Sequence, residues 1–401
     1  MKSTLLHVKR FAQITDAQIE FGDLTVLVGP QATGKSLMLQ FLKLALDRPV
    51  ISRSLWRTGF PRFREQHQLA ATFLGEGYEK CFNSQTRASL GTKNILRQEG
   101  RSSGRKPRVF FIPAQRVVSM ANGWPKSFAE YGPGDPFVVR EFSQQIFEAF
   151  GRGLGKDGAP LFPNPDRLKA PIRKSIEQSI FHGGSLVLRQ DGARKQLTVR
   201  YSRRARSLNR STVSGRLQSK GDVSLPFLEW SAGQREFTPL LLGLYQLLPG
   251  GKVSKHPDYR WAVIEEPEMG LHPKGINSVM LLVFELLYRG YKVAISTHAP
   301  YVLELVWAIQ RLRESRIPKK KRAALLLKAL DNPGTALKKV AATLLKKRIK
   351  VYALTFGKNG KYSCTDISSL DPSDENEQIS GWGGVSSLSG LVSEAVAKGA
   401  R

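Results

Sequence analysis

Cysteine is nearly absent from this sequence, which has two, Cys81 and Cys364, in 401 residues. Two cysteines are too few for a disulfide framework or a cysteine-rich zinc site, and this composition is typical of the reducing cytosol. Long hydrophobic runs are missing too, because the longest apolar stretches, 240–248 and 279–287, are far shorter than the roughly 20 residues that cross a bilayer. Residues 1–11 lack the apolar core of a signal peptide. We therefore expect a cytoplasmic protein with no membrane partner.

Acidic residues are scarce: 33 Asp and Glu stand against 62 Lys and Arg, which gives a formal charge of +29 and a pI of about 10.3. Such a charge favours polyanionic partners but does not distinguish DNA, RNA and an acidic protein. Residues 311–350 hold 14 basic residues and two acidic ones, with apolar residues at helical spacing, and indicate basic amphipathic helices. A second basic, serine-rich stretch, 203–220, is expected to be mobile. A solvated, solubilising surface is the alternative explanation of these charges.

The stretch 24–36, LTVLVGPQATGKS, fits the phosphate-loop pattern G-x-x-x-x-G-K-[ST]. An apolar run precedes it and a helical pattern, 37–46, follows it, which is the strand-loop-helix context that the pattern requires. Backbone N–H groups of such a loop enclose phosphate oxygens, its lysine reaches the β- and γ-phosphates, and its serine hydroxyl binds Mg²⁺. The predicted ATP-binding residues are Gly29, Pro30, Gln31, Ala32, Thr33, Gly34, Lys35 and Ser36.

Two consecutive carboxylates, Glu265 and Glu266, follow the apolar run 261–264. We expect Glu265 to belong to the Mg²⁺ shell and Glu266 to polarise the water that attacks the γ-phosphate. A solvated acidic turn is the alternative. A buried strand that ends in two carboxylates is costly unless a cation compensates them, and this favours the catalytic interpretation.

Three weaker motifs surround this pair. The run 231–235, SAGQR, precedes an apolar helix that starts near Pro239, and alone it is a common serine-capped helix start. His298 ends the run Ser-Thr-His after a predicted strand, where a lone histidine is more often structural. Gln115 follows the run Phe-Ile-Pro-Ala, although Arg116 could be the functional neighbour instead.

In this order, the motifs resemble those of ABC-type ATPase heads of the SMC, RecF and OLD (overcoming lysogenization defect) group. The signature motif of that class is usually Leu-Ser-Gly-Gly-Gln, and here Trp230 and Ala232 replace its leucine and first glycine. Glu265 stands where the class usually has aspartate. The acidic run 265–268, EEPE, followed by GLHP at 270–273, looks like the OLD branch, which includes subunits of phage-defence systems such as PARIS or Septu. The resemblance covers about residues 1–50, 108–116 and 228–305.

The resemblance implies that two heads enclose two ATP molecules, so that Ser231, Gly233 and Gln234 of one copy bind the nucleotide held by Lys35 of the other. It also implies that His298 is a switch histidine and that Gln115 is a metal-contacting glutamine. The implied catalytic residues are Glu266, His298 and Lys35, and the implied metal ligands are Ser36, Gln115 and Glu265.

The expected fold class is α/β: a P-loop NTPase of ABC-ATPase head type, with a mostly parallel core sheet, an N-terminal antiparallel β subdomain and an inserted α+β lid. We predict an N-terminal lobe at 1–132, a lid-like insert at 133–221, a second head segment at 222–310, a basic helical segment at 311–350 and a C-terminal hairpin and tail at 351–401. Further expected elements are a hairpin of 5–11 and 17–21, a partly irregular surface insertion at 52–107, strands at 108–113, 185–189 and 195–201, helices at 141–150 and 168–181, and a small-residue helix after Gly384.

The leading functional hypothesis is an ATP-hydrolysing head that oligomerises and acts as sensor or scaffold for a separate effector, possibly a nuclease, in bacterial anti-phage defence. OLD nucleases carry a Toprim nuclease domain, and we expect none after Leu305. The alternative is a RecF-like DNA-repair ATPase whose basic regions bind DNA directly. The nucleotide-binding subunit of a transporter and a purely structural ATP-binding protein are further possibilities.

Overall fold

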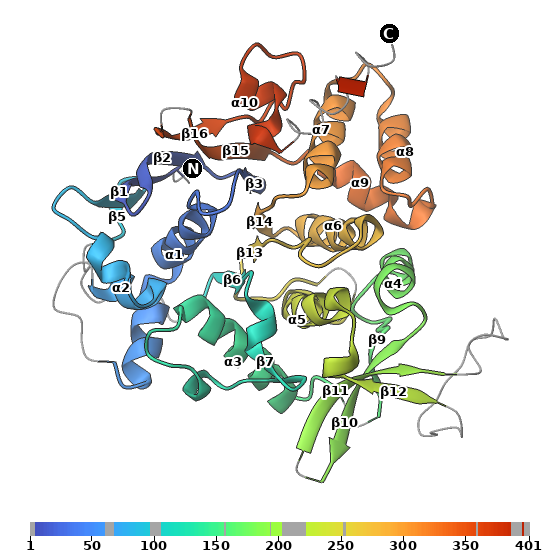
Figure 1. Cartoon of the computed structure of the whole chain (residues 1–401). Coiled ribbons are helices and arrows are strands. Elements are labelled where there is room, and N and C mark those ends of the chain that lie inside the picture. Colours follow the sequence, from blue (N-terminus) through green and yellow to red (C-terminus); the bar gives the residue numbers. More distant parts are fainter. Residues whose placement is uncertain are drawn as a thin grey trace.

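The computed structural model describes residues 5–60, 68–96, 106–155, 158–192, 194–202, 222–251, 254–357, 360–385 and 395–396 (Figure 1). Its strands are β1 Leu5–Phe11, β2 Ile14–Glu20, β3 Leu24–Val28, β4 Arg87–Leu90, β5 Lys93–Asn94, β6 Val109–Ile112, β7 Met120–Ala121, β8 Trp124–Pro125, β9 Pro160–Phe162, β10 Ser185–Asp191, β11 Arg194–Tyr201, β12 Val223–Pro226, β13 Trp261–Glu265, β14 Lys292–Ser296, β15 Ile349–Phe356 and β16 Tyr362–Asp366. Its α-helices are α1 Lys35–Arg57, α2 Gln68–Leu74, α3 Phe137–Gly151, α4 Ala170–Ile176, α5 Ala232–Leu247, α6 Pro273–Tyr288, α7 Pro300–Glu314, α8 Lys319–Ala329, α9 Lys338–Leu344 and α10 Glu377–Ser380.

A six-stranded sheet in the order β16-β15-β3-β14-β13-β6 forms the centre of the molecule. All neighbours in it pair in parallel except β15 and β16, which are antiparallel. Strand β14 lies between β3, which leads into the phosphate loop, and β13, which ends at Glu265. The carboxyl ends of these three parallel strands therefore meet at one edge, the usual place for a ligand in an α/β sheet. The predicted α/β fold with a mostly parallel core sheet is confirmed.

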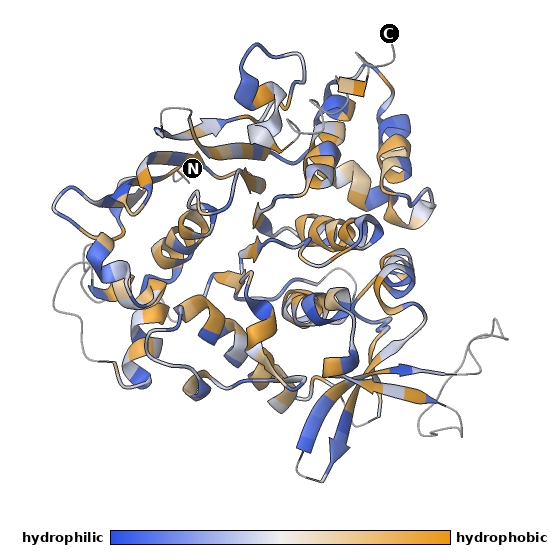
Figure 2. Ribbon diagram, in the orientation of Figure 1, coloured by the Kyte–Doolittle hydropathy of each residue, from blue (hydrophilic) through white to orange (hydrophobic). Residues whose placement is uncertain are grey.

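The residues of the central strands alternate between two hydrophobic cores because successive side chains point to opposite faces. Leu24 and Val26 pack with the core that contains α5, α6 and α7, whereas Leu27 packs with the core that contains α1 and α2. Every residue of β3 and β13 is buried, as is typical of parallel strands covered on both faces. Figure 2 shows this as hydrophobic central strands between helices whose outer sides are hydrophilic.

The N-terminal antiparallel subdomain is a four-stranded sheet in the order β2-β1-β4-β5. The predicted hairpin of β1 and β2 is present. Residues 52–107, predicted as a partly irregular surface insertion, contain irregular loops, but their described helices and strands also pack into the core of this lobe. Helix α1 continues to Arg57, β4 pairs with β1, and Phe73 and Leu74 of α2 are buried. The segment adds core to this lobe.

The insert contains α4 and a second antiparallel sheet, β12-β11-β10-β9. The predicted hairpin of β10 and β11 is present. Two elements differ from the expected limits of 133–221: α3 packs on β6 and α5 of the core, and β12, which pairs with β11, follows residue 221. The basic stretch 203–220 lies outside the described residues.

The C-terminal hairpin belongs to the core sheet, because β15 pairs in parallel with β3. The hairpin was predicted from the sequence, but residues 351–401 were expected to form a region separate from the core. The predicted basic helices are present as the end of α7, α8 and α9. The helix expected after Gly384 falls almost entirely outside the described residues. Within the described residues, the search for a helix of membrane-spanning length and hydrophobicity finds no candidate.

A buried ion-pair cluster joins α1, β6 and α3. Lys43, which is 0% exposed, lies 2.9 Å from a carboxylate oxygen of Asp47 and 2.9 Å from one of Glu141. Asp47 also accepts hydrogen bonds from the backbone N–H groups of Arg108 and Val109, at 2.7 and 3.0 Å. The helix that contains the phosphate-loop lysine at its start is therefore locked to the edge strand of the sheet.

Candidate nucleotide site

The loop between β3 and α1 has the backbone shape of a phosphate cradle. Gly29, Ala32 and Gly34 have positive φ angles of 132°, 58° and 89°, so the chain folds tightly around its own N–H groups. The hydroxyl of Thr33 donates to the carbonyl oxygen of Pro30 at 2.9 Å and fixes the turn. A Cβ on Gly34 would lie 3.0 Å from Ile14 of the N-terminal sheet. The loop therefore requires glycine where the pattern has it.

Lys35 begins α1 and is held inside this loop. Its side-chain ammonium donates to the carbonyl oxygens of Gly29 and Pro30, at 2.9 and 2.7 Å. Burial lowers the pKa of Lys35 to about 8, although the charges of Glu266 and Glu268 raise it. Among the residues that the structure describes, Lys35 has no carboxylate within ion-pair distance. A buried ammonium without a counter-ion fits an anionic ligand in the loop.

Glu265 and Ser36 together form an oxygen-donor pair at the mouth of the loop. Glu265 is 2% exposed, and its carboxylate accepts a hydrogen bond from the N–H of Ala114 at 3.0 Å. Burial raises the pKa of Glu265 to about 7, while hydrogen bonds from Ala114 and from the Ser36 hydroxyl lower it. Within the described residues, no group of three or more histidine, cysteine, aspartate or glutamate side chains is placed to hold a metal ion by itself. A carboxylate and a hydroxyl that leave the remaining positions to water and phosphate oxygens fit Mg²⁺.

Glu266 and His298 come together at the same edge of the sheet. The His298 Nε2 atom lies 3.4 Å from Oε1 of Glu266, and the two side chains are 32% and 31% exposed. Glu266 has a positive φ of 41°, and its N–H donates to the carbonyl oxygen of Ser296 at 2.9 Å. Non-glycine residues in this region of backbone space are strained and concentrate at functional sites. Because both side chains are partly exposed, a water molecule from the solvent can reach the pair.

Glu268 positions the histidine, a role that the sequence reading missed. Its Oε1 atom accepts hydrogen bonds from the His298 N–H at 2.6 Å and from the Thr297 hydroxyl at 2.7 Å. The only hint of this role in the sequence was the acidic run 265–268, which contains Glu268. A carboxylate that binds the backbone beside a histidine is invisible in a sequence, however, because the two segments lie 30 positions apart.

Arg116, rather than Gln115, makes the internal contacts at the end of β6. Gln115 is exposed, and its side chain has no hydrogen bond within the described part of the chain. Arg116 is 0% exposed and donates to the carbonyl oxygens of Glu236, Glu265 and Glu266 at 3.0, 3.1 and 3.1 Å. It thus connects the turn at Glu265 and Glu266 with the start of α5. The predicted metal contact of Gln115 stays a prediction.

The Ser231 turn caps α5 beside the loop that follows Glu266. The Ser231 hydroxyl accepts from the N–H of Gln234 at 3.3 Å, and the Gln234 side chain accepts from the N–H of Ser231 at 3.2 Å. A Cβ on Gly233 would lie 3.0 Å from the carbonyl oxygen of Gly270, so the helix start packs closely on the loop that follows Glu266.

Gln234 has a positioning role that differs from the nucleotide contact expected of it. Its side chain is buried, and its amide nitrogen donates to the carbonyl oxygen of Ile180 at 3.1 Å and to the Tyr201 hydroxyl at 3.0 Å. Both amide donors are used inside the chain. Gln234 therefore joins the serine turn to the insert, and Ser231 and Gly233 are left as the residues of the turn that can face a ligand.

Comparison with known proteins gives one match to a family model over part of the chain and solved structures with low similarity scores. No protein with a curated description matches the sequence. A solved structure of an SMC head bound to the C-winged helix domain of ScpA is 10% identical, covers 91% of this chain and 97% of its own, and has a TM-score of 0.40. The SMC head domain from Thermotoga maritima is 13% identical, with 91% and 99% coverage and a TM-score of 0.32.

Because both TM-scores are low, the fold assignment rests on the topology of this chain. The family model covers part of the candidate site. Residues 125–304, which include Ser231, Glu265, Glu266 and His298 and begin after the phosphate loop, match the family described as "AAA domain, putative AbiEii toxin, Type IV TA system".

Proposed function

We propose that this protein is a Mg²⁺-dependent ATPase. The observation that carries the proposal is the meeting of Lys35, Glu265, Glu266 and His298 at the carboxyl edge of three adjacent parallel strands. An anion cradle, an oxygen-donor pair and a solvent-accessible carboxylate beside a histidine are the parts that phosphoryl transfer to water requires. The match of residues 125–304 to an AAA family supports the same chemistry.

The roles of the side chains follow from their environments. Loop N–H groups and Lys35 would bind the β- and γ-phosphates, since Lys35 is a buried cation already directed at the loop interior. Ser36 and Glu265 would hold Mg²⁺, which supplies charge neutralisation on the phosphates. Glu266 would orient a water and accept its proton, and His298 would hold the Glu266 carboxylate in place across their 3.4 Å contact.

Hydrolysis in this proposal requires two copies of the chain. Ser231 and Gly233 begin α5, a 16-residue helix whose N-terminal end suits an anion. In one protomer they would contact the γ-phosphate held by Lys35 of its partner. ATP would then be both the substrate and part of the interface, and its hydrolysis would change the association of the heads.

The cellular role that we propose is a sensor or scaffold, in bacterial anti-phage defence, for a separate effector protein that can be a nuclease. The support is the order of the motifs together with the description of the matching family, which names a toxin of a type IV toxin–antitoxin system. The bound nucleotide would control whether the effector is held or released.

Replacing Glu266 tests the proposal most directly. Glu266→Gln keeps size and hydrogen bonding but removes the proton acceptor, so we expect hydrolysis to fall by about 10²- to 10⁴-fold. ATP-dependent dimerisation, followed by mass measurement, should persist. Lys35→Ala should weaken both ATP binding and dimerisation, and Glu304→Gln, an exposed glutamate on α7, is the matched control. Wild-type hydrolysis by Glu266→Gln would contradict the catalytic assignment.

The effector role needs its own experiment. The product of a neighbouring gene should co-purify with the protein, and the yield of the complex should differ between ATP and ADP. Equal masses with and without ATP, together with failure of any neighbouring product to associate, would overturn the scaffold role while leaving the ATPase assignment intact.

A further inference from the structure

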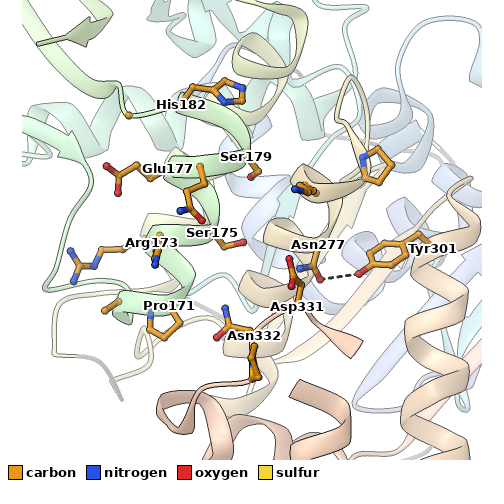
Figure 3. Close-up of a pocket in the computed structure, with 17 residues that line it drawn as sticks. Pro171, Arg173, Ser175, Glu177, Ser179, His182, Asn277, Tyr301, Asp331 and Asn332 are labelled. Carbon is orange, nitrogen blue, oxygen red and sulfur yellow. Dashed lines mark hydrogen bonds between the residues drawn. The ribbon is translucent and has the colours of Figure 1, made fainter. Parts of the chain in front are cut away.

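An open groove of about 1450 Å³ lies between the insert and the core. One wall is α4 with the π-helical turn Glu177–Phe181, and the other is the start of α6 with the connection between α8 and α9. Figure 3 shows Ser175 and Ser179 on the side of the insert wall that is turned toward Asn277, whereas Arg173 and Glu177 extend to its other side. The Tyr301 hydroxyl donates to Asn277 at 3.0 Å, and Asn277 donates to the carbonyl oxygen of Leu330 at 2.8 Å, which fixes the second wall.

The groove contains cations that the chain itself does not neutralise. Arg173 and Lys174 lie on the insert wall, and Lys274 lies on the α6 wall. Within the described residues, none of the three has a carboxylate within ion-pair distance. Two acidic residues, Glu177 and Asp331, also line the groove, and they would repel an anion bound next to them. The lining of the groove thus combines apolar residues with three basic and two acidic side chains, so its charge is positive on balance.

The adjoining basic segment divides into a neutralised part and a free part. Near the core sheet, Lys347, Arg348 and Lys350 form ion pairs with acidic residues of other elements. On α8 and α9, by contrast, six exposed lysines have no carboxylate partner among the described residues. We call these six the lysine face: Lys319, Lys320, Lys321, Lys328, Lys338 and Lys339.

The lysine face continues into the groove along the chain. Helix α8 ends at Ala329, and the next residues, Asp331, Asn332 and Pro333, line the groove before α9 begins at Lys338. The chain therefore runs from the lysines of α8, through one wall of the groove, to the lysines of α9. If the lysines of α8 and α9 served only solubility, there would be no reason for a groove with basic residues on both walls to lie between them in the sequence.

We propose that the groove and the lysine face together bind single-stranded nucleic acid. Unneutralised ammonium and guanidinium groups bind phosphates and release counter-ions, which is the main source of affinity in such complexes. Tyr301 offers a ring for base stacking, and Gln178 and Asn332 offer amides for base edges. A single strand presents its bases to such groups, whereas a duplex keeps them inside.

Fluorescence anisotropy with a labelled oligothymidine and a matching oligouridine tests this proposal. The test pair is Lys174→Gln with Lys274→Gln, because these residues come from opposite walls and their side chains have no hydrogen bond within the described residues. The matched control is Arg57→Gln with Lys80→Gln, two exposed basic residues on the lobe that covers the other face of the sheet. A second pair, Lys328→Gln with Lys338→Gln, tests the lysine face.

The full chain should bind the single strands with an affinity that falls steeply with salt. Each test pair should weaken binding at least about tenfold and reduce the salt slope by about 1.4, because each single-strand phosphate contact contributes roughly 0.7. The control pair should change the affinity less than about twofold. Lys35→Ala should bind the strands normally, so failure of the ATPase proposal would not affect this result.

Four results would overturn the proposal. These are no binding at low salt, an equal loss in the control pair, equal affinity for a duplex of the same length, and equal competition by polyglutamate of the same charge. The last would show that the surface accepts an acidic polypeptide as readily as a nucleic acid.

Discussion

The carbonyl oxygen of Leu354 lies 2.0 Å from the position that a Cβ atom would take on Gly29. The first glycine of the phosphate loop is therefore in close contact with strand β15, more than 300 positions later in the chain. Two features therefore require glycine at position 29. One is its φ angle of 132°, and the other is the nearby backbone of Leu354. The second feature is particular to the C-terminal strand.

Gly29→Ala should therefore destabilise the protein more than an ordinary loop glycine does. Gly77 is the matched control, because its φ is 90° and nothing lies within 4 Å of its added Cβ. We expect Gly77→Ala to cost about 1–2 kcal/mol and Gly29→Ala to cost a further 1–3 kcal/mol or so, because backbone must move. Denaturant unfolding measures both. Equal losses would show that β15 does not press on the loop.

Arg116→Lys should lower the rate of hydrolysis while leaving ATP affinity nearly unchanged. Lysine keeps the positive charge but cannot reach the carbonyl oxygens of Glu236, Glu265 and Glu266 together, so the catalytic turn loses its support. We expect kcat to fall at least about tenfold and the Kd for ATP to change by less than about threefold. Turnover and binding assays on the same preparation separate the two effects.

The comparison variant is Gln115→Ala, one residue away and exposed. A larger loss of kcat in Gln115→Ala than in Arg116→Lys would restore the metal-contacting glutamine that the sequence resemblance implies, and would leave Arg116 with a structural role alone.

Lys43→Met should destabilise the core strongly. The substitution leaves the carboxylate of Glu141 buried without its cation, whereas Asp47 keeps two backbone donors. Breaking a buried pair from one side costs about 3–5 kcal/mol. Adding Glu141→Gln should recover part of the loss, and thermal unfolding of the single and double variants gives the coupling energy. Additive losses would mean that Lys43 and Glu141 do not interact.

Gln234→Glu should separate the serine turn from the insert. Glutamate keeps the oxygen that accepts from Ser231 but lacks the amide donors to Ile180 and Tyr201. We expect a loss of about 1–3 kcal/mol and faster hydrogen exchange in residues 177–201. Tyr201→Phe removes one of these two bonds and should show a smaller change in the same peptides. Unchanged exchange in Gln234→Glu would exclude this connection.

Local sequence patterns were enough to predict the elements that form the nucleotide site. The phosphate loop combines an apolar run, glycines at special φ angles and a helix start within 13 residues, 24–36. The strands before Glu265 and His298 are continuous apolar runs, which is how doubly covered parallel strands read. Each of these apolar runs is followed directly by a candidate site residue. Parallel pairing of the strands therefore places these residues at one edge of the sheet.

The missed features depend on contacts between distant segments. Strand β15 reads as half of a hairpin, and its second partner, β3, has no local signal in the sequence. The side chains of Arg116 and Glu268 bind backbone groups. Since every residue has these groups, the sequence does not show which residue is the partner. Strands β4 and β5 are four and two residues long, too short for a periodicity to be recognised.

Strand β15 also sets an order of events during biosynthesis. Val28 and Ile349 are 321 positions apart, so a ribosome must finish most of the chain before β3 gains its second neighbour. Until then the strand has an unpaired edge, which is prone to wrong association. A nascent polypeptide without β15 would thus have a phosphate loop that lacks this neighbouring strand, and we expect the loop to take its final shape only after Ile349–Phe356 has been synthesised.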